Sequence, residues 1–251
     1  MVDAMKRQRE APFHLEPSDA LLSRVAACRV GDVNPLWFDN SFPMPVILVD
    51  DFRVRNTIDI DFTNGAHHFS ADYVPLGELW IGNAQDNEDH YYWALRQWEE
   101  YALMSDGMPY SLAFDKARAG ELLARSKKEY PVRPIKKYLI SETHNGDTIW
   151  RVSGFQVRQR KFIDFTLGGN YMVYPFIPKR EIWIDDAVRE EEVPAIIVHE
   201  CTEVKMWQEA NLNYHEAHRL ATDAERLFRE KLDTYGKATM LKELGLNFHT
   251  W

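Results

Sequence analysis

One block of this sequence occurs twice. The segments 59–81 and 162–184 align without a gap at a spacing of 103 residues, and nine of the twenty-three aligned positions are identical. Self-similarity at one fixed spacing is most simply explained by a duplicated structural unit, and two copies are too few for a solenoid. The chain is therefore expected to fold as two similar units, packed together with approximate internal symmetry.

The order of patterns within each copy defines the expected unit. A shared Ile-Asp-Phe-Thr motif leads to a glycine, an apolar run carries Glu-x-Trp-Ile, and two stretches with helical periodicity follow. We expect an α+β fold in which each unit has short strands followed by a helix pair. The expected boundaries are an N-terminal extension at 1–45, a first unit at 46–130, a linker and hairpin at 131–160 and a second unit at 161–251.

Shorter patterns place individual elements. Ser18-Asp19 is a start signal for a helix over Leu21–Cys28. The apolar run Val46–Val49 predicts a buried strand. Asn145-Gly146 between two β-rich runs predicts a hairpin. Tryptophans that recur in both copies are expected in the core: Trp80 and Trp183.

The stretch Val193–Trp207 carries the strongest chemical signal. On a helix, His199 and Glu203 are four residues apart and therefore lie on one face. Glu200 follows His199 directly and lies about 100° round the same helix, near the same cleft. Two potential metal ligands and a spare carboxylate are thus expected close together.

A second helix is expected to bring a further ligand. Asn213 is suited to cap this helix, and Glu216 three residues later completes a capping box. His218 falls little more than a turn into it. We expect His199 and Glu203 to surround one divalent cation, zinc, together with His218, and to leave one position open for water. Glu200 is then placed to act as the general base.

Other histidine and cysteine side chains are weaker candidates. Cys201 lies about 200° round from His199 and is expected in the core. His215 lies about 60° from His218 and is expected to be exposed. The adjacent pair His67-His68 points in opposite directions on a strand, which argues against joint ligation. The remaining histidines have no convincing partners: His14, His90, His144 and His249.

Two further short motifs have open interpretations. Gly168-Gly169 is interpreted as a tight turn between strands, and the alternative is positive-φ backbone or close approach to a bound group. Asp185 and Asp186 are interpreted as turn residues, and the alternative is hydrogen bonding to a histidine N–H.

The first copy provides a comparison for the helix pair. A fainter match continues at a spacing of 104, and it places Leu95, Arg96 and Phe114 opposite His199, Glu200 and His218. On this alignment the architecture does not require the two histidines. Glu203 and Glu225 do have glutamate counterparts, Glu99 and Glu121. Glu225 is therefore interpreted as a hydrogen-bond acceptor between the helices, and Glu203 remains open to both interpretations.

The second copy resembles uncharacterised phage and bacterial proteins that carry a zincin-like metal site. The residues that carry the resemblance are Asp164–Asn170, Ile177–Asp186, His199-Glu-x-x-Glu203 and Tyr214-x-x-Ala-His218. They lie within 163–225, about a quarter of the chain. The resemblance implies a zincin-like second unit but no established substrate, and the chain departs from the zincin pattern His-Glu-x-x-His.

Three functional interpretations follow. The first is a zinc-dependent hydrolase, peptidase-like, which uses a metal-bound water on a peptide or small-molecule substrate. The second is a non-catalytic binding or structural protein of a phage or mobile element, with a structural or vestigial metal site. In the third, His199 and His218 only form hydrogen bonds to Glu203 and Glu225 in the core.

Composition narrows the cellular setting. The net charge of −9 argues against general nucleic-acid binding, and the basic cluster Lys6–Arg9 is short. Apolar runs are too short for a membrane span, and the N-terminus lacks a signal-peptide pattern. Two cysteines are compatible with a reducing compartment. We expect a cytoplasmic protein (in the host cytoplasm or the virion if phage-encoded), with its oligomeric state left open.

Overall fold

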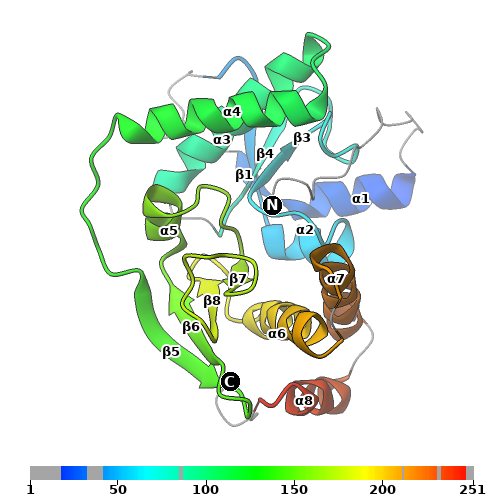
Figure 1. The fold of residues 1–251 in the computed structure, drawn as a ribbon. Coiled ribbons are helices and arrows are strands. Elements are labelled where there is room, and N and C mark those ends of the chain that lie inside the picture. The colour runs from blue at the N-terminus through cyan, green and yellow to red at the C-terminus, as the bar shows by residue number, and fades with distance from the viewer. Residues whose placement is uncertain (1–17, 33–41, 85–86, 211, 231–232, 247–251) are drawn as a thin grey trace. The chain divides into compact units, whose positions relative to one another are not determined.

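The computed structural model describes residues 18–32, 42–84, 87–210, 212–230 and 233–246 (Figure 1). The chain divides into two compact units, Met1–Pro131 and Val132–Trp251. Three sequence-based interpretations fall outside the described residues: those of Lys6–Arg9, His14 and His249.

The first unit is one four-stranded sheet with four helices among its described residues. Its elements are α1 (Asp19–Cys28), β1 (Arg29–Asp32), β2 (Val46–Val49), α2 (Asp51–Thr57), β3 (Gly65–His67), β4 (Leu79–Gly82), α3 (Asn87–Ser105) and α4 (Tyr110–Ser126). The strand order is β1-β2-β4-β3. The central pair β2 and β4 is parallel, and both outer pairs are antiparallel.

The second unit repeats this topology. Its elements are β5 (Lys136–Glu142), β6 (Thr148–Val152), α5 (Gly154–Arg160), β7 (Gly168–Asn170), β8 (Glu181–Asp185), α6 (Val193–Glu209), α7 (Tyr214–Glu230) and α8 (Thr234–Glu243). The strand order is β5-β6-β8-β7, again with a parallel central pair. In each unit the two long helices pack against one another (Figure 1). The predicted α+β fold with two similar units is confirmed.

Local sequence explains where these elements begin. Side chains at the N-caps of four helices accept hydrogen bonds from backbone N–H groups, at Ser18, Asp50, Ser153 and Asp233. The apolar residues of β2 and β4 are almost all buried, as expected of central strands. The helix α1 and the strand β2 therefore agree with their predictions.

Among the described residues, no helix combines the length and apolar character needed to cross a membrane.

The sheet register shows that the duplicated unit is longer than the matched sequence blocks. The pair Ile47 and Trp80 in the first sheet recurs as Trp150 and Trp183 in the second, at the same spacing of 103. Trp80 and Trp183 are both buried, as predicted.

Two predicted boundaries need correction. The segment 131–160 is not a linker, because β5 and β6 are strands of the second sheet, joined by the predicted hairpin. The segment 1–45 is not only an extension, because β1 pairs with β2. Only one position of the strands β2 and β6 is identical at the spacing of 103, Val49 and Val152, so a match of identical residues does not detect these strands.

A buried arginine lies at the same position in both units. In the first unit, Arg55 on α2 pairs with Asp51 on the same helix, at 3.2 Å. In the second, Arg158 on α5 pairs with Asp185 at the end of β8. All four side chains are almost fully buried. The two units therefore have the arginine at the same position and the carboxylate at different positions. The carboxylate lies on the helix in the first unit and on the strand in the second.

The glycines explain how this exchange is possible. Gly154 takes the helix position of Asp51, and a Cβ there would clash with the Asp185 carboxylate. Gly82 takes the strand position of Asp185, and a Cβ there would lie 3.0 Å from Asp51. Each unit has room for only one of the two carboxylates.

We expect Asp185→Ala to destabilise the second unit by about 3–5 kcal/mol, because it leaves the Arg158 guanidinium buried without its carboxylate. Adding Gly154→Asp to this variant restores the arrangement of the first unit and is expected to recover part of the loss. Urea unfolding of the two variants measures both effects. A double variant no more stable than Asp185→Ala would contradict the exchange.

Candidate metal centre

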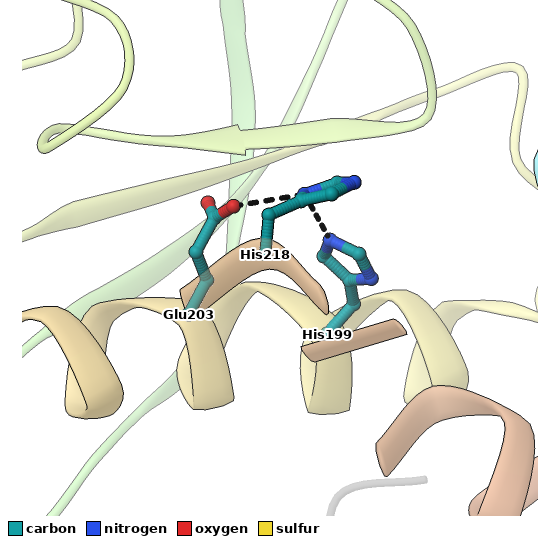
Figure 2. Close-up of side chains that lie close together, drawn as sticks. All are labelled: His199, Glu203 and His218. Carbon is teal, nitrogen blue, oxygen red and sulfur yellow. Dashed lines mark hydrogen bonds and ion pairs between the residues drawn. The ribbon is translucent and has the colours of Figure 1, made fainter. Parts of the chain in front are cut away.

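The predicted helix pair is present and is capped as expected. The Glu216 backbone N–H donates to Asn213 Oδ1 at 3.1 Å, and the Asn213 N–H donates to Glu216 Oε2 at 3.3 Å. This capping box begins α7 at Tyr214, so that His218 lies beside α6. Figure 2 shows His199 and Glu203 projecting from one face of α6, with the ring of His218 above them.

Three potential ligand atoms converge between these helices. The distance from His218 Nδ1 to His199 Nε2 is 3.2 Å, and to Glu203 Oε1 it is 3.0 Å. Three such atoms lie within 4.8 Å of one another, and together they could hold a metal ion. Ligands about 2.0–2.1 Å from a tetrahedral zinc ion are about 3.3 Å apart, close to the two separations that share His218 Nδ1.

The cluster reaches solvent on one side. The side chain of Glu203 is 3% exposed and that of His199 is 11% exposed, whereas that of His218 is 33% exposed. A ligand held by these three groups would therefore be covered from below by α6 and accessible past His218.

The available protons cannot satisfy the contacts of His218. Glu225 Oε2 lies 2.9 Å from His199 Nδ1, and because a carboxylate only accepts, this nitrogen carries a proton. A proton on His218 Nδ1 can make a full two-centre hydrogen bond to His199 Nε2 or to Glu203 Oε1, and can serve both only in a weaker, shared bond. If His199 Nε2 carries a proton instead, it donates to the lone pair of His218 Nδ1. Glu203 Oε1, which faces the same nitrogen, then has no donor. A cation among the three atoms satisfies all of them.

Glu225 and Arg229 hold His199 in place. Arg229 Nε donates to Glu225 Oε1 at 2.8 Å, and its Nη2 lies 2.8 Å from Glu192. Burial alone would raise the pKa of Glu225, but the hydrogen bonds and charges of His199 and Arg229 outweigh it and lower that pKa. Burial alone would lower the pKa of His199, but Glu225, with Glu200 and Glu203, raises it to about 9. The interpretation of Glu225 as an acceptor between helices is confirmed.

Asn170 is a residue that the sequence did not assign to the site. Its Nδ2 donates to Glu203 Oε2 at 2.6 Å and to Glu200 Oε2 at 2.9 Å. Its Oδ1 accepts from the backbone N–H groups of Met172 and Val173, which fixes the orientation of the amide. One oxygen of each carboxylate is therefore occupied, and Glu203 presents only Oε1 to the cluster. The only signal in the sequence was its place after two glycines.

Glu200 is buried beside the strand β7. An ideal Cβ built at Gly168 would lie 3.1 Å from Glu200 Oε1 and 2.9 Å from Ile196 Cγ2, so the glycine allows α6 to approach the strand. Burial, and then the charge of Glu203, raise the pKa of Glu200 to about 8, against the opposing influence of His199 and Asn170. A carboxyl group with this pKa is suited to exchanging a proton near neutral pH.

The interpretation of Gly168-Gly169 as a turn is wrong. Both glycines lie in β7, and neither has a positive φ. Their lack of a Cβ instead permits close packing against protein side chains: Ile196 and Glu200 at Gly168, and Tyr174 at Gly169.

The weaker candidates do not join the cluster. Cys201 is buried in the core of the second unit, and His215 is exposed, both as expected. Asp185 pairs with Arg158, and Asp186 Oδ1 accepts from the Gly154 N–H at 3.2 Å. The alternative in which these aspartates orient a histidine is therefore wrong.

Contacts in the first unit correct the alignment of the helices. Arg96 Nη1 lies 3.3 Å from Glu121 Oε2, just as His199 pairs with Glu225. A Cβ at Gly65 would lie 3.1 Å from Gln97 Cγ, as one at Gly168 would lie beside Glu200. His67 Nε2 lies 3.1 Å from Glu100 Oε1, where Asn170 contacts Glu203.

The spacing of 103 therefore extends through α3 and α6. Arg96, Gln97 and Glu100 are the counterparts of His199, Glu200 and Glu203, whereas the sequence comparison used residues one position earlier. The spacing between equivalent residues changes from 103 to 104 between Glu203 and Tyr214. Phe114 therefore remains the counterpart of His218. The alignment of Leu95 with His199 is wrong, because the counterpart is Arg96, which makes the equivalent ion pair, and both units therefore have a polar residue at this position.

In the first unit, the guanidinium of Arg96 provides a positive charge at the position equivalent to the cluster. The guanidinium carbon of Arg96 lies 4.4 Å from the centroid of the Phe114 ring, and the guanidinium also pairs with Glu121. The first unit has Gln97 where the second has Glu200, so it has one carboxylate fewer. In the second unit two imidazoles and an additional carboxylate take the place of this fixed positive charge.

The third interpretation, in which the histidines only join helices, predicts two contacts that are present, His199 to Glu225 and His218 to Glu203. It does not account for the 3.2 Å approach of His199 Nε2 to His218 Nδ1.

No family of proteins, curated sequence or solved structure matches this chain, so the interpretation of the centre depends on its geometry.

Proposed function

We propose that the second unit is a zinc-dependent hydrolase in which His199, Glu203 and His218 hold the ion. The strongest support is the convergence of three electron-pair donors, spaced 3.0 and 3.2 Å from the shared His218 Nδ1, which have too few protons to satisfy one another. Two imidazoles and one carboxylate are an established ligand set for zinc in open, catalytic sites. When bound, such an ion supplies a Lewis acid and lowers the pKa of a coordinated water towards 7.

The surrounding residues have separate roles in this proposal. Glu200 would accept the proton of the attacking water, because among the described residues it is the one carboxylate at the centre that is neither a proposed ligand nor hydrogen-bonded to a histidine. Asn170 occupies the second oxygen of Glu203 and keeps it a single-oxygen ligand. Glu225 accepts from His199 Nδ1, which would leave Nε2 available to hold the ion.

The proposed substrate class is a peptide or a small molecule with a peptide-like amide bond. The zincin resemblance supports this class, because the ligand inventory is the same with two positions exchanged. The described residues contain no membrane-spanning helix, and the acidic balance of the chain does not favour nucleic acid as a substrate.

The test combines metal content with activity. Protein purified without added metal is expected to contain about one zinc ion per chain, and a chelator is expected to abolish cleavage of a fluorogenic peptide library until zinc is restored. Absence of metal, together with no uptake on titration, would end the proposal.

Asn170→Ala is expected to weaken zinc binding by about 10–100-fold, since residues that orient ligands contribute on this scale. Competition with a chromogenic chelator measures the affinity. His67→Ala, the equivalent change in the first unit, is the matched control and is expected to leave zinc affinity unchanged. Equal affinities for Asn170→Ala and wild type would contradict the role of Asn170.

The alternative is a non-catalytic phage or mobile-element protein in which the ion only joins α6 and α7. A structural zinc is normally closed by four protein ligands. Among the described residues the cluster has three, and His218 is one-third exposed, which favours the catalytic proposal. In the alternative, removing zinc lowers the melting temperature but no substrate is hydrolysed.

A further inference from the structure

The helix α1 of the first unit has no counterpart before β5 in the second. In the first unit, α1 runs directly into β1 and lies beside α2 (Figure 1). In the second, the residues that precede β5, 129–134, form neither helix nor strand. Two prolines in this segment, Pro131 and Pro134, disfavour helical backbone in the residues before them. The second unit therefore lacks an element that the first unit has.

In the first unit, α1 covers a defined part of the sheet. Its residues Val25 and Cys28 are buried in one core cluster with Trp80 on β4. Arg24 Nη1 on the same helix donates to the backbone oxygen of Thr57, at the end of α2, at 2.8 Å. The helix thus packs over the sheet face that carries Trp80 and against the end of α2.

Backbone hydrogen bonds identify the equivalent place in the second unit. The N-cap residue of α2 donates its backbone N–H to Cys28 O at 2.8 Å, and the N-cap residue of α5 donates to Ile135 O at 2.7 Å. Ile135 is therefore the counterpart of Cys28. Three residues earlier, Val25 is 6% exposed in the first unit, whereas Val132 is 77% exposed in the second. An apolar side chain is thus left uncovered where the helix is missing.

A hollow of about 600 Å³ lies at this place in the second unit. It is lined by Val132–Lys136, by Arg160 and Lys161 at the end of α5, and by Trp183 on β8. Trp183 is the counterpart of Trp80, and the end of α5 is the counterpart of the end of α2. The hollow is therefore bordered by the elements that α1 contacts in the first unit.

The hollow and the candidate metal centre lie on opposite faces of the second sheet. Along β8, Ile182 and Ile184 belong to the core cluster that includes residues of α6, the helix of His199. Trp183 stands between them, and alternate residues of a strand point to opposite faces. An inference about the hollow is therefore independent of the metal centre.

Basic side chains gather around this hollow. Four of its eight lining residues are arginine or lysine and none is acidic, so its charge favours an anionic ligand. Lys136 pairs with Glu181. Within the described part of the chain, no carboxylate pairs with the other three, which are Arg133, Arg160 and Lys161. Arg160 Nη1 donates to the uncharged backbone oxygen of Arg133 at 2.9 Å.

The charge at the end of α5 is found only in the unit that lacks the helix. Arg160 and Lys161 take the positions of Thr57 and Ile58, which are uncharged. The chain as a whole has a net charge of −9, so its composition does not explain a local excess of cations. Like charges held close together repel one another, and an anionic partner relieves this repulsion.

We propose that this hollow binds an acidic amphipathic helix of a partner protein. The first unit shows that a helix fits over the equivalent surface, because α1 packs there. Val132 and Ile135 would contact the apolar side of the partner helix, as an apolar groove does when it binds a helical segment. Carboxylates beside that apolar side would pair with Arg133, Arg160 and Lys161.

The test uses the full-length protein and three fluorescein-labelled peptides, with binding measured by fluorescence anisotropy. The first peptide has leucine at the spacing of Leu21, Val25 and Cys28 of α1, and glutamate and alanine elsewhere. The second has lysine in place of glutamate, and the third has alanine in place of leucine. The first is expected to bind at least about 10-fold more tightly than either of the others, because only it matches both the apolar wall and the charge.

Val132→Asp locates the binding surface. This side chain is exposed, so folding is expected to be unaffected. Binding of the acidic peptide is expected to weaken at least about 10-fold, because the new carboxylate faces the peptide without a partner and repels its glutamates. Leu123→Asp, at a 59% exposed position of α4, is the matched control and is expected to change nothing.

Arg160→Thr combined with Lys161→Ile installs the residues of the first unit at the end of α5. This variant is expected to lose the preference for glutamate over lysine peptides, and a preference equal to that of wild type would overturn the role of the two charges.

Four outcomes would overturn the proposal itself. One is that the acidic peptide does not bind, and another is that it binds wild type and Val132→Asp equally. Equal binding of the leucine-free peptide would identify a site for anions alone. A wild-type dimer that Val132→Asp dissociates on size-exclusion chromatography would identify a second copy of this chain as the occupant.

Discussion

A variant in which His199 becomes arginine and His218 becomes phenylalanine is expected to fold and to lose its affinity for divalent cations. The first unit provides the reason, because Arg96 and Phe114 pack at the equivalent positions, 4.4 Å from guanidinium carbon to ring centroid. The introduced arginine is expected to pair with Glu225, as Arg96 does with Glu121. Its permanent charge would then repel an incoming cation.

The loss of affinity is expected to be large. Removal of a residue that only orients a ligand costs about 10–100-fold, and this variant removes two ligands outright, so we expect a loss beyond about 100-fold. Isothermal titration with zinc measures it directly. Wild-type protein should also melt at a higher temperature with zinc, because free ligand at about 1,000 times its dissociation constant stabilises by about 4 kcal/mol.

Two outcomes would contradict this expectation. Retained zinc affinity in the double variant would show that the ion binds elsewhere. A variant that unfolds without zinc present would show that the helix pair of the second unit does not tolerate the residues of the first. His215→Ala is the control, because this exposed histidine lies on the same helix as His218 and should affect neither property.

Glu200→Gln is expected to keep zinc and to lose about 10²–10⁴-fold in the rate of hydrolysis, the usual contribution of general acid–base catalysis. Gln97 holds the equivalent position in the first unit and packs against Gly65 as Glu200 packs against Gly168, so the amide fits. Its oxygen can still accept the hydrogen bond of Asn170. The amide cannot take a proton from water at neutral pH, and therefore only the chemical step is affected.

Parallel measurement of zinc content and kcat separates the possible roles of Glu200. Loss of zinc from Glu200→Gln would identify Glu200 as a ligand instead of a base. Unchanged kcat with full zinc content would exclude it from the reaction. Glu99→Gln, on the helix of the first unit, is the control and is expected to leave kcat unchanged.

The comparison of the units shows why sequence alignment failed inside the helices. Glu99 and Glu100 are adjacent, and either can be matched with Glu203 by identity. In a strand the sheet register removes such ambiguity, and the spacing of 103 is preserved residue by residue. In a helix only tertiary contacts do so, and the contact of His67 with Glu100 identifies the correct counterpart.

The sequence by itself determined the duplication, the α+β class and the three residues of the candidate cluster. These follow from local rules, because helical periodicity puts residues four apart on one face and a capping box sets where the next helix begins. Only the tertiary structure decided which groups surround them. Asn170 and Glu225 reach the centre from 26 to 33 positions away in the chain, and the packing of α6 against β7 and α7 brings them there. Such contacts depend on how the elements pack, which no local pattern of residues encodes.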